Sequence, residues 1–236
     1  MDASQQHAGF IDFVPESRFG VWFLNTRTWH EQVLKRALDD LQRLMPARER
    51  WSVVLDIGCG HGQSLDDLAT RFRPERIVAL DVDPGFPQRV QGARERCPVP
   101  VELRIADAAA IPLADATVDL VHCHQTFHHL AHQEAAMREF HRVLKPGGAL
   151  LFAESTKRFI ESWIIRLLFR HPMHVQKTAP QYVALIRAAG FELPDARISY
   201  PFLWWSRPDI GFLEWIGIPP PVEREETMVN AVAIKR

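Results

Sequence analysis

Short apolar runs alternate with longer mixed segments through the middle of the chain, from residue 53 to residue 154. Each apolar run has the length of a buried strand, and each mixed segment can form a helix. The predicted strands are 53–57, 76–81, 101–106, 118–123 and 149–154, and the predicted helices are 61–72, 87–96 and 131–144. Parallel strands joined by right-handed helical crossovers are the simplest arrangement, so the pattern predicts an α/β, Rossmann-like, doubly wound sheet.

The flanking segments extend this pattern on both sides. Residues 29–44 carry apolar side chains on one helical face before Pro46, which predicts a helix that packs on the sheet. Residues 178–189 predict another helix, and the apolar runs 191–200 and 228–235 predict an antiparallel pair of strands. The result is a mostly parallel seven-stranded sheet with an antiparallel edge strand.

Two segments of the second half do not fit the alternation. Residues 201–224 are rich in Trp and Pro without a clear period, which indicates an ordered insertion over the sheet edge. Residues 158–170 carry one apolar helical stripe with an arginine at each end, shorter than the ~20 residues of a membrane span. We expect this stripe to be a buried helix, with the alternative that it covers a lipophilic substrate or makes peripheral contact with a membrane.

Composition sets the class of protein. The 236 residues are 47% hydrophobic, enough for one sizeable core, and we expect one domain over residues 1–236. Within it, residues 1–50 form an N-terminal lid and helix, 51–154 the ligand-binding core, and 155–236 substrate-side insertions and the sheet edge. Because 28 Lys and Arg face 29 Asp and Glu, we expect no nucleic-acid partner. Three cysteines without CxxC spacing and an acidic N-terminus without a signal peptide favour the cytoplasm.

The clearest local signal is the sequence VVLDIGCGHG at 53–62, a buried strand that runs into three alternating glycines. Glycines let the backbone approach a ligand closely, and the following helix offers unpaired N–H groups. Dinucleotide sites prefer GxGxxG, and Gln63 stands where the third glycine of that pattern would fall. The spacing therefore indicates a ligand site that differs from an NAD site.

A second apolar strand ends in Asp81, about 20 residues after the glycines. A carboxylate at this place can accept hydrogen bonds from both hydroxyls of a ribose. Asp81 therefore predicts a ligand that contains a nucleoside, whereas Asp83, followed by Pro84, is typical of a helix start.

Four blocks together carry a family resemblance: VLDIGCGHG, VALDVDP, ADAAAIPLADATVDLVHCHQTFHHL and RVLKPGGALLFAE. Their order and spacing over residues 53–154 resemble the class I S-adenosylmethionine-dependent methyltransferases, and most closely the small-molecule branch that includes the ubiquinone and menaquinone biosynthesis enzymes. The resemblance implies S-adenosylmethionine as cofactor and a small organic molecule as methyl acceptor. Aromatic residues lie before and after the core, and a pocket with aromatic walls would suit a hydrophobic acceptor.

The resemblance also implies roles for particular residues. Asp56, Gly58, Cys59 and Gly60 would hold the methionine and ribose parts of the cofactor. Asp81 would bind the ribose hydroxyls, Val82 would lie against the adenine, Asp107 would accept from the adenine amino group, and Ala108 would offer its backbone N–H. The chain departs from the family at Asp83, where relatives often have Ser, and at His124, where relatives commonly have Asn.

Five histidines crowd residues 122–132 and raise the question of a metal site. His128 and His132 have the i, i+4 spacing of a helical metal pair, but no Glu stands between them as in HExxH. We therefore expect no metal, and we take His124 and His128 as the candidate catalytic residues. His124 ends a central strand, where open α/β sheets bind ligands, and it could contact the substrate or remove a proton from it.

Two other functions remain open at this stage. A nicotinamide-dependent oxidoreductase would bind NAD or NADP, although the glycine spacing and Asp107 disfavour it. A non-catalytic S-adenosylmethionine sensor or partner-binding protein would bind the nucleoside without turnover, and the acceptor side of the sequence carries no motif that excludes it. The sequence does not predict an oligomeric state.

Overall fold

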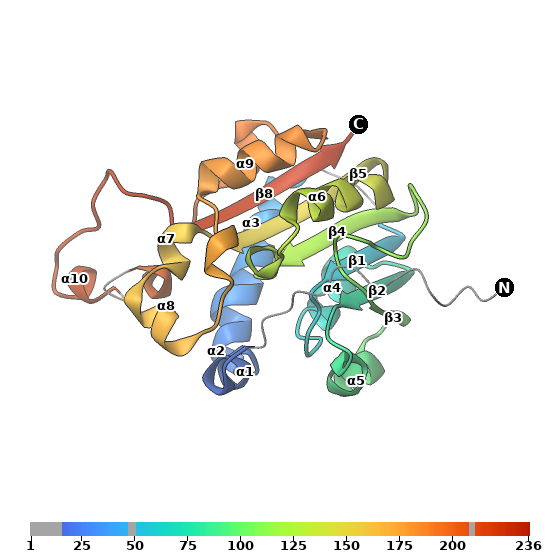
Figure 1. The fold of residues 1–236 in the computed structure, drawn as a ribbon, viewed down its shortest axis with the longest axis horizontal. Helices are drawn as coiled ribbons and strands as arrows, with labels where there is room; N and C mark the ends of the chain where they lie inside the picture. The colour runs from blue at the N-terminus through green and yellow to red at the C-terminus, as the bar shows by residue number, and fades with distance from the viewer. Residues whose placement is uncertain (1–15, 47–50, 208–210) are drawn as a thin grey trace.

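The computed structural model describes residues 16–46, 51–207 and 211–236, and its centre is one twisted sheet (Figure 1). In the described residues the strand order is β3-β2-β1-β4-β5-β8-β6, with β7 also paired to β8. The strands are β1 Val53–Ile57, β2 Arg76–Asp81, β3 Val101–Ile105, β4 Val118–His124, β5 Leu144–Ser155, β6 Phe191–Glu192, β7 Ile198–Ser199 and β8 Met228–Lys235. The first five are parallel, and β8 runs antiparallel to its neighbours on both sides. The predicted Rossmann-like class is confirmed.

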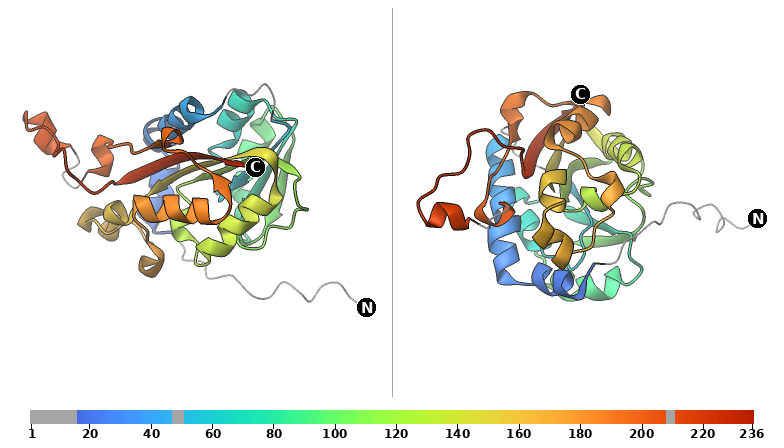
Figure 2. Two further views of the ribbon diagram at one scale, coloured as in Figure 1. Left: turned by 90° about the horizontal axis from the view of Figure 1, so that it is seen from above. Right: turned by 60° about the vertical axis from the view of Figure 1, so that its left-hand side comes forward.

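Helices cover both faces of the sheet (Figure 2). Those before and within the core are α1 Arg18–Leu24, α2 Arg27–Trp29, α3 Lys35–Leu44, α4 Leu65–Phe72, α5 Phe86–Arg96 and α6 Gln133–Val143. Those after it are α7 Lys157–Ile160, α8 Trp163–Leu168, α9 Ala179–Ala188 and α10 Phe212–Trp215. A π-helical segment, His30–Leu34, joins α2 to α3. The buried side chains of α3, α4 and α5 belong to one apolar cluster, and those of α6 and α9 to the other.

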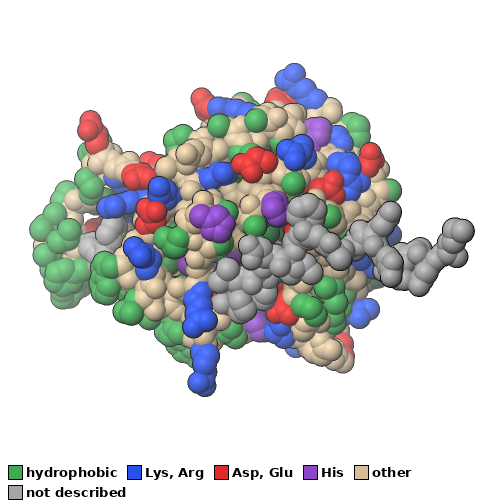
Figure 3. Space-filling model, viewed as in Figure 1, with side chains coloured by type: hydrophobic (Ala, Val, Ile, Leu, Met, Phe, Trp, Pro, Cys, Tyr) green, Lys and Arg blue, Asp and Glu red, His purple; other side chains and the backbone are tan. Residues whose placement is uncertain are grey.

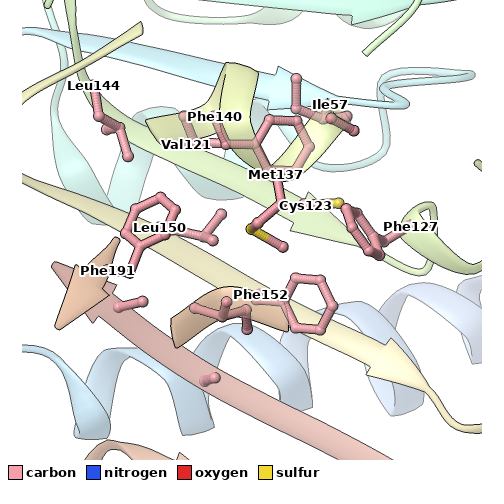
Figure 4. Packing of buried hydrophobic residues seen from close by; sticks show 14 of the residues in the cluster. Ile57, Val121, Cys123, Phe127, Met137, Phe140, Leu144, Leu150, Phe152 and Phe191 are labelled. Carbon is pink, nitrogen blue, oxygen red and sulfur yellow. The ribbon is translucent and has the colours of Figure 1, made fainter. Parts of the chain in front are cut away.

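The cluster under α6 and α9 holds the central strands in place. Met137 and Phe140 of α6 lie over Cys123 of β4 and Phe152 of β5, with Phe127 at the carboxyl end of β4 (Figure 4). These five side chains are fully buried. The carboxyl ends of β1, β4 and β5 are therefore fixed by packing, and these ends carry the candidate site.

Most predicted elements are found with small shifts at their ends. Helix α4 begins at Leu65 instead of residue 61, because Gly60 and Gly62 have φ of 54° and 76°, which an α-helix does not accommodate. The predicted strand 191–200 consists of two short strands, β6 and β7, because Pro194 lies between them and has no N–H to donate to a neighbouring strand. The sheet consequently counts eight strands in the described residues instead of seven.

The expectation of one helical stripe over residues 158–170 is wrong. The chain forms two short helices, α7 and α8, because Ser162 leaves the helical conformation with φ −62° and ψ 145°. Ile160 and Ile165 are buried, whereas Trp163 and Leu167 are 69% and 74% exposed. The two helices therefore bury some of their apolar side chains in the protein and expose others at the surface.

The Trp- and Pro-rich insertion lies beyond the end of the sheet, where α10 forms a projecting lobe (Figure 1). Exposed apolar side chains of this lobe include Phe212, Trp215 and Ile218, and hydrophobic groups gather there in Figure 3. No helix in the described ranges combines the length and the apolar character that a membrane span needs.

We expect Gly62→Ala to destabilise the protein more than Gly147→Ala, although both glycines have φ near 77°. A Cβ at Gly62 would lie 2.7 Å from Ala93 Cβ and 2.9 Å from Val90 Cγ2, whereas a Cβ at Gly147 meets no atom within 4 Å. We expect losses of about 2–4 kcal/mol for Gly62→Ala and about 1 kcal/mol for Gly147→Ala, measured by urea unfolding. Equal losses would show that the contact with α5 is unimportant.

Candidate functional site

A pocket of about 340 Å³ lies at the carboxyl ends of the parallel strands. Segments that follow four strands contribute to it, and the helix α1 closes one side with Val21 and Leu24. Open α/β sheets bind ligands at this end, where the strand order reverses between β1 and β4. Its polar wall consists of Glu16, Gly58, Gly60, His61, Asp81, Asp83, Arg89, Asp107, Gln125, Thr126 and His129.

The glycine turn after β1 approaches two other parts of the chain. The backbone N–H groups of Gly58 and Cys59 both donate to the carbonyl oxygen of Leu80, at 2.8 and 3.2 Å. Gly58 has φ 68°, and a Cβ at this position would collide with the side chain of Thr126 after β4. Only glycine fits here, because both the backbone conformation and the space exclude a side chain.

Asp81 joins the glycine turn to the end of β2. Its Oδ2 accepts from the N–H of Gly60 at 2.9 Å, and its Oδ1 accepts from the N–H of Asp83 at 3.0 Å. A carboxylate has about four lone-pair sites, so each oxygen can accept a further hydrogen bond from a ligand. The carboxylate is thus oriented by the chain before a ligand binds.

The neighbouring acid, Asp83, is paired within the protein. Its Oδ2 lies 2.9 Å from Arg89 Nη1, and its Oδ1 accepts from the N–H of Gly85 at 2.7 Å. The guanidinium of Arg89 therefore offsets the negative charge that this departure from the family introduces. Arg89 lines the same pocket, and its part could not be anticipated from the sequence, where it is one of several arginines.

The structure brings six of the eight predicted cofactor residues to one pocket. Gly58, Gly60, Asp81, Val82, Asp107 and Ala108 line the 340 Å³ pocket. The other two, Asp56 and Cys59, line an adjoining pocket of about 110 Å³, which also includes Gly58 and Gly60. The glycine turn therefore separates two spaces, a larger one beside β2 and a smaller one beside β4.

Asp56 is buried in the wall of the smaller pocket. Its Oδ2 accepts from the hydroxyl of Ser64, and its Oδ1 lies 2.7 Å from His122 Nδ1. Burial, and after it the charge of Asp56, raise the pKa of the Cys59 thiol well above its ordinary value, so Cys59 is not a nucleophile here. Sequence reasoning identified Asp56 but not its two partners, which lie 8 and 66 residues away.

His124 also lines the smaller pocket. Its ring lies parallel to that of His122, with centroids 6.0 Å apart, and its edge contacts Trp29 with centroids 5.6 Å apart. Burial is the main reason why the pKa of His124 lies well below its ordinary value, and the nearby His122 and His128 lower it further. The imidazole is therefore neutral at physiological pH, and its Nε2 is buried without a hydrogen-bond partner in the described residues.

A third, largely apolar pocket of about 220 Å³ adjoins the first. Phe19 and Phe23 of α1 form one wall, and Phe159, Ile160, Ile165, Leu168, Phe169 and Trp205 form the other. Edge-on ring contacts join Phe169 to Phe19 and Phe23, with centroids 5.7 and 5.9 Å apart. The third pocket shares Glu16, Leu24, Gln125 and His129 with the 340 Å³ pocket.

Gln125 lies at the junction of all three pockets. It has φ 50°, an uncommon conformation for a residue with a side chain, and strained residues of this kind gather at functional sites. Its N–H donates to the Ala153 carbonyl at 2.9 Å, and its Oε1 accepts from the Ser155 hydroxyl at 2.7 Å. The sequence gives no sign of this backbone conformation, so it does not point to Gln125 as a site residue.

His128 is held by a buried acid at the end of β5. Its Nδ1 lies 2.6 Å from Oε2 of Glu154, which is fully buried. The other oxygen, Oε1, accepts from the N–H groups of Thr126 and Phe127 at 2.8 and 2.7 Å. His128 lines the apolar pocket, whereas His124 does not. Glu154 was missed as a candidate site residue because it is the last residue of the predicted strand 149–154 and carries no motif of its own.

Comparison with known proteins agrees with this geometry. The fold and the pocket define an α/β domain with a polar pocket after β1 and β2. Residues 55–152 match a family model described as "Methyltransferase domain". This part of the chain is therefore similar to a methyltransferase domain, which agrees with the resemblance carried by the four sequence blocks.

Curated relatives are similar to this chain over part of their length. An uncharacterized methyltransferase-like protein of Schizosaccharomyces pombe is 37% identical over 136 residues, which are 56% of this chain and 49% of that protein. A malonyl-[acyl-carrier protein] O-methyltransferase of Marinomonas is 28% identical over 181 residues, 74% of this chain and 65% of that protein. The chain spans about half the length of the first curated relatives that it matches.

Solved structures show the same fold. A putative methyltransferase of Haloferax volcanii, solved with the Trm112 methyltransferase activator, superimposes with a TM-score of 0.65 at 20% identity. The match covers 92% of this chain and 95% of that one. At this identity the likeness shows the fold alone.

We expect His124→Gln to make stability less dependent on pH. In the wild type, the unfolded His124 takes up a proton below pH 6.5 while the folded residue does not, so stability falls as the pH falls. Between pH 7 and pH 5.5 this loss is about 1 kcal/mol, and the variant should lack it. Urea unfolding of both proteins at the two pH values gives the difference, and equal pH dependence would show that His124 is protonated in the fold.

Proposed function

We propose that this chain transfers the methyl group of S-adenosylmethionine to a small organic acceptor of hydrophobic character. One observation carries the proposal: a polar pocket that fits the nucleoside shares a wall with an apolar pocket of about 220 Å³. Methyl transfer requires donor and acceptor to meet in line, and two adjoining pockets allow this. The matched family supplies the reaction class.

The residues present fit the cofactor. The open space beside Gly60 and the oriented carboxylate of Asp81 suit a ribose, and Val82 offers an apolar surface to a base. Asp107 and Ala108 line the same pocket and would bind the adenine edge. S-adenosylmethionine, when bound, supplies an electrophilic methyl group on a sulfonium.

The smaller pocket suits the methionine end of the same molecule. Its walls include the glycine turn, Cys59 and the buried carboxylate of Asp56, which would attract an ammonium group. His124 lies in this pocket, so we propose that it contacts the cofactor tail, with a neutral imidazole that leaves the sulfonium undisturbed.

The apolar pocket would hold the acceptor. Its aromatic walls favour a hydrophobic body, and Gln125, His128 and His129 are the polar groups that could orient the reacting atom. We keep His128 as the candidate catalytic residue on the acceptor side, since His124 does not reach this pocket. The name of the Marinomonas relative makes an acyl carboxylate one acceptor class to test first.

The two alternative functions are not favoured. The matched family model and the two curated relatives named above are described as methyltransferases. None of the pocket features described above favours a nicotinamide cofactor over S-adenosylmethionine. A sensor would bind S-adenosylhomocysteine and methylate nothing, so a screen by mass spectrometry for acceptors that gain one methyl group separates it from an enzyme. Peripheral membrane contact, suggested by the apolar residues of 158–170, stays a prediction.

We expect Asp81→Ala to weaken binding of S-adenosylhomocysteine about 10- to 100-fold, because two ribose hydrogen bonds to a charged acceptor are lost. Isothermal titration calorimetry measures this affinity. Asp115→Ala is the control, because Asp115 is exposed and pairs with Arg142, and neither residue lines the pocket. Unchanged affinity in Asp81→Ala would remove Asp81 from the site, and no binding by the folded wild type would overturn the proposed function.

We expect Phe169→Ala to raise the KM for a hydrophobic acceptor several-fold, because Phe169 is half-buried and a bound acceptor would cover the rest of its ring, at about 25 cal/mol for each Å² of apolar surface removed from water. Phe169 lines the apolar pocket and not the cofactor pocket, so the affinity for S-adenosylhomocysteine should stay within twofold. Steady-state kinetics and calorimetry on the same samples give both numbers. A loss of cofactor affinity with an unchanged KM would place the acceptor elsewhere.

A further inference from the structure

We propose that His128, His129 and His171 bind a divalent transition metal ion, with zinc as the best match, at the border between the cofactor pocket and the apolar pocket. One ring nitrogen from each histidine lies within 4.8 Å of those of the other two. His129 lines both pockets, and His128 and His171 line the apolar one. The cluster therefore lies where a bound acceptor would reach it.

The three rings already face one another. Their centroids are 4.3 Å apart for His128 and His129, 5.1 Å for His128 and His171, and 4.8 Å for His129 and His171. Zinc–nitrogen bonds of about 2.0–2.1 Å in tetrahedral geometry place the ligand nitrogens about 3.4 Å apart. The nitrogens, which lie within 4.8 Å of one another without an ion, would have to approach by up to about 1.4 Å when the ion binds.

Glu154 supplies the support that metal-binding histidines usually have. The Nδ1–H of His128 donates to Oε2 of Glu154 at 2.6 Å, which leaves Nε2 as the nitrogen available to a metal. The carboxylate itself is fixed by the N–H groups of Thr126 and Phe127. A buried negative charge directly behind one ligand would also offset part of the charge of the ion.

Gln176 joins the two segments that carry the ligands. His128 and His129 belong to a 3₁₀ turn after β4, whereas His171 lies 42 residues further on, between α8 and α9. The side-chain amide of the buried Gln176 donates to the carbonyl oxygens of both His128 and Pro172, each at 2.9 Å. This bridge holds His171 against the other two histidines before any ion binds.

The sequence pattern alone could not suggest this set. The expectation of no metal rested on the pair His128 and His132, and His132 is not a member of the cluster found in the described residues. The three neutral donors that come together are soft enough for zinc, cobalt or nickel and unsuited to magnesium or calcium. Three protein ligands leave a fourth position for water or an oxygen of the acceptor, as catalytic zinc sites do. With Nδ1 bonded to Glu154 and Nε2 to the ion, His128 would act on an acceptor through the ion and not as a free base. This role toward an acceptor rests on the proposed function, whereas the binding of the ion does not.

The test is metal binding by the full chain, with any affinity tag removed and resident metal stripped by a chelator. We expect one equivalent of Zn²⁺ per chain by calorimetry, and visible absorption bands of a four-coordinate site with Co²⁺. His171→Ala and His129→Gln should each lower the Zn²⁺ affinity at least tenfold, and Glu154→Gln about 10- to 100-fold. His174→Ala is the matched control, because His174 is exposed on the same segment and outside the cluster.

Two outcomes would overturn the inference. The first is that the folded wild type binds neither Zn²⁺ nor Co²⁺ stoichiometrically. The second is that the ligand variants keep wild-type affinity, which would place the ion elsewhere. Circular dichroism confirms that each variant is folded, and two independent ligand variants guard against a folding defect in one. S-adenosylhomocysteine binding by the same samples separates the two proposals: metal loss with intact cofactor binding contradicts only this inference, and the converse contradicts only the proposed function.

Discussion

The geometry of the site depends on the absence of side chains at Gly58 and Gly62. At Gly58 the turn after β1 lies against Thr126, which follows β4, and at Gly62 it lies against Val90 and Ala93 of α5. A methyl group at either place would push the turn away from its neighbours. Because the turn forms a wall of both polar pockets, their size and separation follow from these two contacts.

Acids at the ends of the strands share a common design. Asp56, Asp81 and Glu154 end or nearly end β1, β2 and β5, and each accepts hydrogen bonds from the chain itself. Their orientation is thus set by folding and does not await a ligand, which lowers the entropy lost on binding. The two pockets at β1 and β2 therefore contain carboxylates of fixed orientation, and His122 and His124 of β4 line the smaller one.

The sequence was sufficient to predict the parallel core, because its strands and turns follow from patterns of residues that are close together in the chain. The bounds of β1 and β2 and the glycine turn follow from apolar periodicity and glycine spacing. The break between α7 and α8 was missed because serine is compatible with a helix. The extended conformation of Ser162 depends on tertiary contacts, which override helix propensity. The cluster with His171 and the support from Glu154 were missed for another reason, since they join residues 26 to 43 positions apart.

Pro194 divides one edge of the sheet into the short strands β6 and β7, and this affects whether two copies of the chain can pair edge to edge. Strands β6 and β7 have two residues each, so this side of the sheet offers no long row of unpaired N–H and C=O groups. At the opposite edge, β3 carries the oppositely charged pair Glu102 and Arg104. Short or charged borders of this kind discourage strand addition, and the fold is thereby protected against edge-to-edge aggregation.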